Sequence, residues 1–335
     1  MSEKELLQAI KNRNLKPVYL FYGDEPFFID QYTGLFEKNF LTEEEKSFNY
    51  TVLYGYETDM YQVTGECRRY PLMGSHSLVI VKEAQKIKDW TALEKYLENP
   101  LDSTVLVLAY KEGAPDRRKT FFKAIEKKGL AIEFKKLYDN QLPDWIKKYV
   151  SGKGYRIDDK TSVWLAEMIG NDLRKLTNTL EQIFLLSGPD QPLTIDFLSL
   201  HIGISKDFNV FELIDAIGSR NIAKATLIVN YLGQHSKENP FIMINSMIFR
   251  FFQQLLIYHQ GLKLKWDNKI MSQKTGLHFY HLKKMPMVTK NFKLEQAMAA
   301  IEICAQMDAK SKGINAPAID DASLLKELIF KILSL

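Results

Sequence analysis

The chain has 335 residues, a length that favours two or three domains, and 46% hydrophobic with 26% charged residues exclude a disordered or collagen-like chain. The net charge of +4 is unevenly divided, because residues 1–205 carry 28 Lys and Arg against 30 Asp and Glu, whereas residues 206–335 carry 17 against 11. The C-terminal part is therefore the one expected to work near a polyanion.

The two cysteines, Cys67 and Cys304, are far apart in the sequence and belong to no paired spacing. This usage argues against a disulfide framework or a structural zinc site and favours a reducing compartment. The N-terminus is charged from its third residue, unlike a signal peptide, and no apolar run reaches the length of a membrane span. We therefore expect a cytoplasmic protein that contacts no membrane.

Short apolar strands alternate with helical patterns in the first part of the chain. The strands are expected at residues 17–23, 48–54, 77–83, 103–110 and 130–136. Helical periodicity appears between them, around residues 25–38, 59–69, 89–98 and 116–128. Continuous apolar strands separated by helices predict a largely parallel sheet covered on both faces, and hence an α/β domain.

After Leu142 the sequence shows helical patterns and no further strands. Short helices are expected as far as about residue 206, and longer amphipathic helices follow from Phe208 to the end. The sequence thus predicts an α/β domain followed by all-α structure. We expect three domains, which span residues 1–141, 142–206 and 207–335.

The turn after the first strand is where a parallel α/β domain is expected to hold a nucleotide. A working phosphate loop reads G-x-x-x-x-G-K-[ST], because its glycines let backbone N–H groups surround the phosphates while lysine neutralises their charge. Here Gly23 is followed by residues that supply no second glycine, lysine or hydroxyl: Asp24, Glu25, Pro26 and Phe27. The two acids would repel phosphate, and Pro26 lacks an N–H donor.

The strand that binds Mg²⁺ in such ATPases ends in acidic residues. In the nearest candidate, residues 79–85, Lys82 stands where the metal-ordering aspartate is needed. Failure at both the phosphate and the metal position argues against nucleotide hydrolysis. The domain has the pattern of an ATPase fold without its chemistry.

Six segments in sequence order, spread over nearly the whole chain, resemble the delta subunit of the bacterial DNA polymerase III clamp loader. They read PVYLFYGDEPFFIDQY, YPLMGSHSLVIVKEAQK, STVLVLAY, GNDLRKLTNTLEQI, FNVFELIDAIGSRNIAKA and MDAKSKG. The resemblance implies an AAA+-like N-terminal domain, a helical lid domain and a helical collar domain that mediates oligomerisation.

The same resemblance implies a non-catalytic subunit without a cofactor or metal, which is a component of the DNA polymerase III holoenzyme, itself a DNA-directed DNA polymerase. Its implied partners are the ring-shaped sliding clamp, or beta subunit, the motor and delta-prime subunits of the loader, and primed DNA within the complex. Delta-prime is a poorer match, because two cysteines cannot form its zinc module and Ser219-Arg220 is followed by Asn221 in place of cysteine.

In this family a hydrophobic pair on the tip between a helix and the next strand grips the clamp. The matching residues are Leu72 and Met73, framed by Pro71 and Gly74. A proline-restricted tip loses less entropy on binding, and methionine adapts to an imperfect pocket. The alternative is that both side chains fold back under the sheet as a plug.

Residues 261–293 hold eight lysines and one acid, with aromatic residues between them. Lysines neutralise phosphate and aromatic rings stack on unpaired bases, so this segment is the best candidate for contact with DNA. The residues selected are Lys263, Lys265, Trp266, Lys283 and Lys284. The alternative, favoured by the periodicity of the aromatic residues, is a solvated collar face with its rings in the core.

Two other functions stay open at this point. One is an AAA+-type ATPase with an atypical phosphate loop, and the other is a helical protein that binds DNA without partners.

Overall fold

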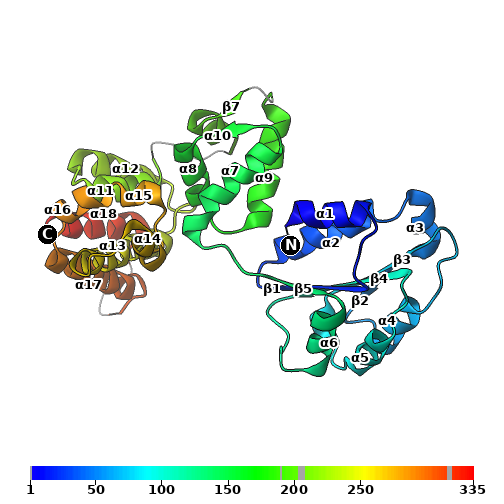
Figure 1. Ribbon diagram of the computed structural model, residues 1–335. Helices are drawn as coiled ribbons and strands as arrows, with labels where there is room; N and C mark the ends of the chain where they lie inside the picture. The colour runs from blue at the N-terminus through cyan, green and yellow to red at the C-terminus, as the bar shows by residue number, and fades with distance from the viewer. Residues whose placement is uncertain (1, 189–190, 203–207, 315–318) are drawn as a thin grey trace. The chain divides into compact units, whose positions relative to one another are not determined.

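A computed structural model describes residues 2–188, 191–202, 208–314 and 319–335. The chain divides into two compact units, Met1–Lys136 and Leu137–Leu335 (Figure 1). The division falls close to the predicted boundary at residue 141. The second predicted boundary, between residues 206 and 207, lies outside the described residues, so the three-domain division stays a prediction.

The first unit is built on a five-stranded sheet in the order β2-β3-β4-β1-β5, in which every pair of neighbours is parallel. The strands are β1 Val18–Gly23, β2 Tyr50–Tyr54, β3 Ser77–Lys82, β4 Thr104–Lys111 and β5 Leu130–Phe134. All five predicted strands are confirmed, each within two residues of its expected bounds. They form because apolar runs rich in β-branched and aromatic residues suit a parallel sheet, in which the three central strands are buried on both faces.

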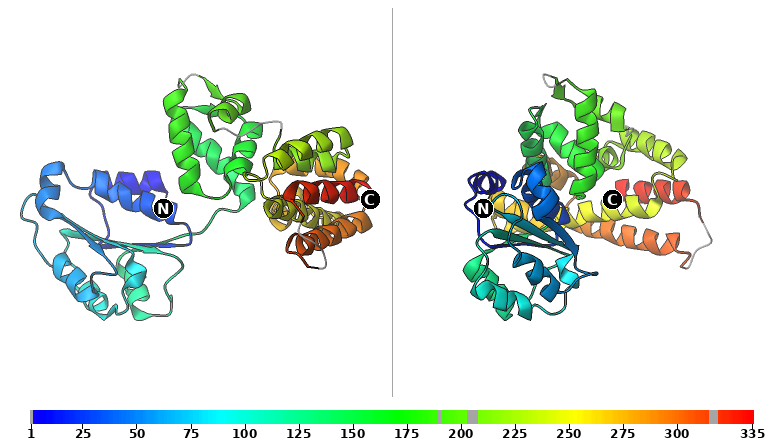
Figure 2. Two further views of the ribbon diagram at one scale, coloured as in Figure 1. Left: turned by 180° about the vertical axis from the view of Figure 1, so that it is seen from behind. Right: turned by 90° about the vertical axis from the view of Figure 1, so that its right-hand side faces the viewer.

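Helices cover both faces of this sheet (Figures 1 and 2). One face packs on α1 (Glu3–Lys11) and α2 (Pro26–Asn39). The other packs on α4 (Met60–Cys67), α5 (Thr91–Glu98) and α6 (Thr120–Lys128). Successive side chains of each central strand enter opposite cores, as the alternation of a strand requires.

A short helix that the sequence analysis did not predict, α3 (Glu43–Asn49), precedes the edge strand β2. It begins with a capping box, in which the Thr42 side chain accepts from the Glu45 backbone and the Glu45 carboxylate accepts from the Thr42 N–H at 3.0 Å. A single-turn helix η1 (Ala84–Lys86) follows β3.

The N-terminal part of the second unit is a small helical group. It contains η2 (Asp139–Gln141), α7 (Leu142–Gly152), α8 (Asp159–Ile169), α9 (Leu173–Leu186) and α10 (Ile195–Ile202). The prediction that no strand follows residue 142 is wrong in one detail, because β6 (Arg156–Ile157) and β7 (Pro192–Leu193) form a two-stranded parallel ladder. Strands of two residues are too short to produce a periodic signal.

All the secondary structure described from residue 208 onward is helical, and this C-terminal part of the second unit has its own hydrophobic core. Its helices are α11 (Val210–Gly218), α12 (Ile222–Gln234), α13 (Phe241–Lys263), α14 (Asn268–Thr275), α15 (Phe279–Leu282), α16 (Met285–Asn291), α17 (Leu294–Ser311) and α18 (Asp321–Leu333). The longer helices among them confirm the prediction of amphipathic helices from Phe208 onward. The three between residues 268 and 291 were not predicted, because each spans at most eight residues.

By length and composition, α13 could cross a membrane, contrary to the expectation that no such run exists. Its residues Phe241, Ile244, Ile248, Phe252 and Leu255 are nevertheless buried in the core among the other helices. A helix at the centre of a helical bundle is apolar for that reason alone. We therefore interpret α13 as a core helix.

Candidate functional site

The tip predicted to bind the clamp is the loop from Arg68 to His76, between α4 and β3 (Figure 1). The Leu72 side chain is 83% exposed and Met73 is 44% exposed. These values exclude the alternative in which both side chains plug the underside of the sheet. An exposed leucine beside an exposed methionine presents apolar surface to solvent.

The buried side chain of Asn49, the last residue of α3, holds the backbone of the tip. Its Oδ1 accepts from the Leu72 N–H at 2.9 Å and from the Met73 N–H at 3.4 Å. Its Nδ2 donates to the Met73 carbonyl oxygen. One amide side chain thus satisfies three backbone groups of the tip, which has no regular secondary structure of its own.

The base of the tip rests on the same helix. Gly74 adopts a left-handed conformation, with φ of 71°, and a Cβ there would collide with the Glu45 carboxylate. Glu45 also pairs with Arg13 at 3.3 Å, and Arg13 Nη1 donates to the Ser75 hydroxyl at 2.7 Å. The left-handed φ favours glycine at position 74, and the close approach of Gly74 to the Glu45 side chain places the base of the tip against α3.

Hydrogen bonds and charges at the foot of the tip favour the ionised form of Glu45. The Thr42 backbone N–H, which donates to its carboxylate, holds the pKa of Glu45 below the ordinary 4.5, with burial opposing and Arg13 reinforcing the effect. A carboxyl with a depressed pKa contributes stability above its unfolded pKa and loses it as the pH falls. The support under Gly74 is thus fully present at neutral pH.

Every large hydrophobic side chain that is exposed among the described residues of the first unit lies between residues 48 and 73. They are Phe48, Tyr54, Tyr56, Tyr61, Tyr70, Leu72 and Met73. Phe48 directly precedes Asn49 and follows Glu45 by one helical turn, so it lies on the helix that carries the tip. Phe48 is not among the site residues predicted from the sequence, because α3 was not predicted.

The turn after β1 is closed upon itself. The Glu25 N–H donates to the Phe134 carbonyl at 3.1 Å, and the Glu25 carboxylate accepts from the Phe27 N–H at 3.2 Å, at the start of α2. At Gly23, whose φ is 134°, a Cβ would collide with the Phe134 carbonyl oxygen. A carboxylate of the chain thus occupies the end of the helix where a phosphate loop would place phosphate.

Lysine side chains occupy the neighbouring carboxyl ends of β3 and β4. Lys82 pairs with Glu37 of α2 at 2.9 Å, whereas Lys111 pairs with Asp30 of α2 at 2.8 Å and with Glu83 at 3.4 Å. Ammonium groups therefore stand where an ATPase would need carboxylates for Mg²⁺. Among the described residues, no group of three His, Cys, Asp or Glu side chains is arranged to hold a metal ion.

Comparisons with known proteins match segments in both units of the chain. The family model described as DNA polymerase III, delta subunit, matches residues 19–135, and a second model, for the C-terminal domain of the same protein, matches residues 207–332. The chain belongs to the DNA polymerase III delta subunit family. The delta subunit of Bacillus subtilis is 24% identical over 318 residues, which cover 92% of this chain and 91% of that protein.

The solved Bacillus subtilis DNA clamp loader delta protein matches with a TM-score of 0.61 and 23% identity, over 99% of both chains. With the parallel sheet and the largely helical second unit, this match confirms the predicted fold class, an α/β domain with a parallel sheet followed by helical structure. The match to a Thermotoga maritima RuvB structure covers 64% of this chain and 74% of the RuvB chain, with 14% identity and a TM-score of 0.36.

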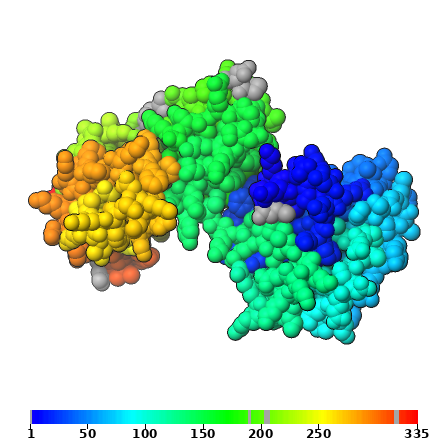
Figure 3. All heavy atoms as spheres, viewed as in Figure 1, coloured from blue at the N-terminus to red at the C-terminus, as the bar shows by residue number. Residues whose placement is uncertain are grey.

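The lysine-rich segment of this delta family member, residues 261–293, divides into structural and exposed residues. Trp266 packs against Gly261 and the hydrophobic core of the C-terminal helices, and Lys284 pairs with Asp215 of α11. Lys263, Lys265 and Lys283 are exposed. Yellow to orange side chains of this part of the chain form a broad surface of the second unit (Figure 3). Contact with DNA at these positions stays a prediction.

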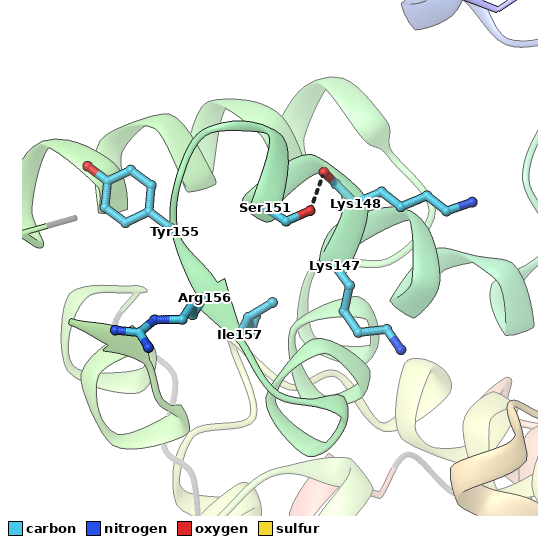
Figure 4. A pocket seen from close by; sticks show the side chains of 6 residues that line it. All are labelled: Lys147, Lys148, Ser151, Tyr155, Arg156 and Ile157. Atoms are coloured by element: carbon cyan, nitrogen blue, oxygen red, sulfur yellow. Dashed lines mark hydrogen bonds between the residues drawn. The ribbon is translucent and has the colours of Figure 1, made fainter. Parts of the chain in front are cut away.

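A pocket of about 450 Å³ in the second unit is lined by Lys147, Lys148, Ser151, Tyr155, Arg156 and Ile157 (Figure 4). Its basic lining suggests an anion site. Lys147, however, is paired with Asp144 at 2.9 Å and with Asp159 at 2.7 Å. Because that charge is already neutralised, we assign no ligand to the pocket.

Nucleotide should not bind to the first unit, because the turn after β1 uses its N–H donors internally and lysines occupy the metal position. A ligand at about 100 times its Kd stabilises the folded state by about 2.7 kcal/mol. We therefore expect millimolar ATP with Mg²⁺ to leave the melting temperature unchanged. Mg²⁺ alone at equal ionic strength is the control, and a concentration-dependent rise with ATP would contradict the expectation.

Proposed function

We propose that this delta family member binds the ring-shaped sliding clamp through Leu72 and Met73 and opens one interface of the ring for loading onto primed DNA. The observation that carries the proposal is the exposed apolar pair, fastened to α3 by three hydrogen bonds. Family membership supports it, because the family acts in the clamp loader. In this role the protein is non-catalytic and works in the cytoplasm.

Ring opening follows from differential binding. A clamp-binding protein shifts a closed ring toward the open form only by as much as it binds the open form more tightly. A fixed apolar pair suits this task, because a rigid anchor transmits the geometry of the first unit to the clamp without losing entropy at the tip. No phosphate chemistry of its own is needed for that work.

The direct test is binding of the purified full-length chain to the clamp, compared with a variant in which both tip side chains are truncated. If the protein is instead an atypical ATPase or a DNA-binding protein without partners, truncation of the tip should not change clamp affinity. A clamp affinity that does not depend on Leu72 and Met73 would overturn the proposed site.

The helical second unit is proposed to join the motor and delta-prime subunits, and its basic surface to lie near primed DNA in the assembled loader. Each phosphate contact that is lost lowers the magnitude of the log–log salt slope by about 0.9. We expect Lys263→Ala with Lys265→Ala to lower that slope by about two for the loader–clamp complex on primed DNA.

The control for the DNA experiment is Lys127→Ala with Lys128→Ala, which removes two exposed lysines from α6 of the first unit. That pair should leave the salt slope unchanged. Equal slopes for the parent complex and the Lys263, Lys265 variant would remove these residues from the DNA contact.

A further inference from the structure

We propose that Asn49 is the positioning residue of the clamp-binding tip: its side-chain amide fixes the backbone of Leu72 and Met73 in the conformation that binds the clamp. The inference rests on the proposed function of the tip and adds to it a buried residue that acts behind the exposed pair. Asn49 is only 5% exposed, so its role is exerted through the loop.

The hydrogen-bonding pattern fixes the orientation of the Asn49 amide. Two backbone N–H groups point to one atom of the side chain and one carbonyl oxygen faces the other. Only an acceptor at the first position and a donor at the second satisfy all three groups. Aspartate lacks the donor, a hydroxyl is too short to reach both residues, and alanine offers neither group.

The hydrogen bonds of Asn49 order the backbone of Leu72 and Met73 and so reduce the entropy that these residues lose on binding. Fixing the backbone of one residue costs about 1–2 kcal/mol, and Leu72 and Met73 have no ladder or helix partner to do so. Asn49 orders both residues before the clamp arrives, while their side chains stay exposed. The neighbouring contact of Gly74 with Glu45 limits the loop on its other side.

The helix α3 contacts the tip through two of its residues, Glu45 and Asn49. Glu45 and Asn49 are four residues apart on α3 and therefore face the same side. The first contacts Gly74 and the second bonds to Leu72 and Met73. The α3 helix, which contributes little to the hydrophobic core, thus serves as a platform for the tip.

The test combines clamp affinity with hydrogen exchange of the Leu72 and Met73 amides in the full-length protein. Asn49→Ala should weaken clamp binding about tenfold or more, because the clamp must then order Leu72 and Met73 itself, and both amides should exchange faster. Asn49→Asp keeps the acceptor, so it should restore much of the amide protection and part of the affinity. Asn49→Ser should behave like Asn49→Ala and substitutes for it if that variant does not fold.

Asn245→Ala is the matched control. Asn245 is also 5% exposed, and its Nδ2 donates to the Cys304 carbonyl at 3.0 Å in the core of the second unit. Its loss should lower stability without changing clamp affinity or the exchange of the tip amides. A general loss of stability is thereby separated from a loss of tip order.

The outcomes distinguish this inference from the proposed function. If truncation of Leu72 and Met73 leaves clamp affinity intact, the proposed function fails. If that truncation abolishes binding but Asn49→Ala and Asn49→Ser keep full affinity or slow amide exchange, only the positioning role of Asn49 is overturned. Weaker binding with faster exchange at both amides supports the role.

Discussion

Replacement of Leu72 and Met73 by alanine should weaken clamp binding about 100-fold or more, because two anchor residues that each contribute about 2 kcal/mol act as hot spots. Both side chains are exposed in the free chain, so their truncation removes little buried surface and the melting temperature should stay within about 1 °C of the parent. Surface plasmon resonance on immobilised clamp measures the affinity, and calorimetry measures the melting temperature.

The chain offers a matched control in Leu185 and Leu186, an exposed aliphatic pair at the end of α9 that is 87% and 59% exposed. Leu185→Ala with Leu186→Ala removes similar apolar surface from the second unit and should keep full clamp affinity. Equal losses in the two double variants would indicate non-specific apolar binding. No loss in either would place the clamp contact elsewhere on the molecule.

The sheet could be predicted from the sequence because its strands are short, mostly apolar runs. Residues 77–83 and 103–110, for example, hold their apolar residues without interruption and are bounded by polar segments. That pattern suits only an element buried on both faces. The order β2-β3-β4-β1-β5 carries no such signal, since it depends on pairing between segments far apart in the chain.

The tip could be located from the sequence, but its support could not. Pro71 and Gly74 mark a turn, and the apolar pair between them is visible in the sequence itself. Asn49 lies 23 and 24 residues from its partners, on a seven-residue helix rich in charge. Neither periodicity nor composition reveals an asparagine that acts across such a separation.

The lysine-rich segment shows the same limit in the second unit. Its charge is a property of the sequence, but the ion pair between Lys284 and Asp215 joins residues 69 positions apart. Sequence alone could not divide Lys284 from the exposed Lys263 and Lys265. The packing of α11 against the turn before α16 places Asp215 beside Lys284, whereas Lys263 and Lys265 stay exposed to solvent.

Substitution of Arg220 is the second change for which we expect a large effect, in this case on the stability of the second unit. Arg220 follows α11, and its guanidinium donates to the Asn291 carbonyl at 2.9 Å and the Leu333 carbonyl at 3.2 Å, at the ends of α16 and α18. It also lies 4.4 Å from the centre of the buried Phe292 ring. A cation that satisfies the terminal carbonyls of two helices stabilises both of them.

Arg220→Ala should therefore lower the free energy of unfolding of the second unit by about 2–4 kcal/mol, through two charge-assisted hydrogen bonds and one cation–π contact. Arg220 has a φ of 52°, in the left-handed region. Alanine would be strained there as arginine is, whereas glycine adopts this conformation freely. Arg220→Gly should thus be less destabilising than Arg220→Ala by up to about 1 kcal/mol. Arg118→Ala is the control, because Arg118 of the first unit is 90% exposed and should change stability by less than about 0.5 kcal/mol. Calorimetry of the full chain measures all three variants. A shift for Arg220→Ala no larger than that for Arg118→Ala would show that solvent replaces these contacts at no cost.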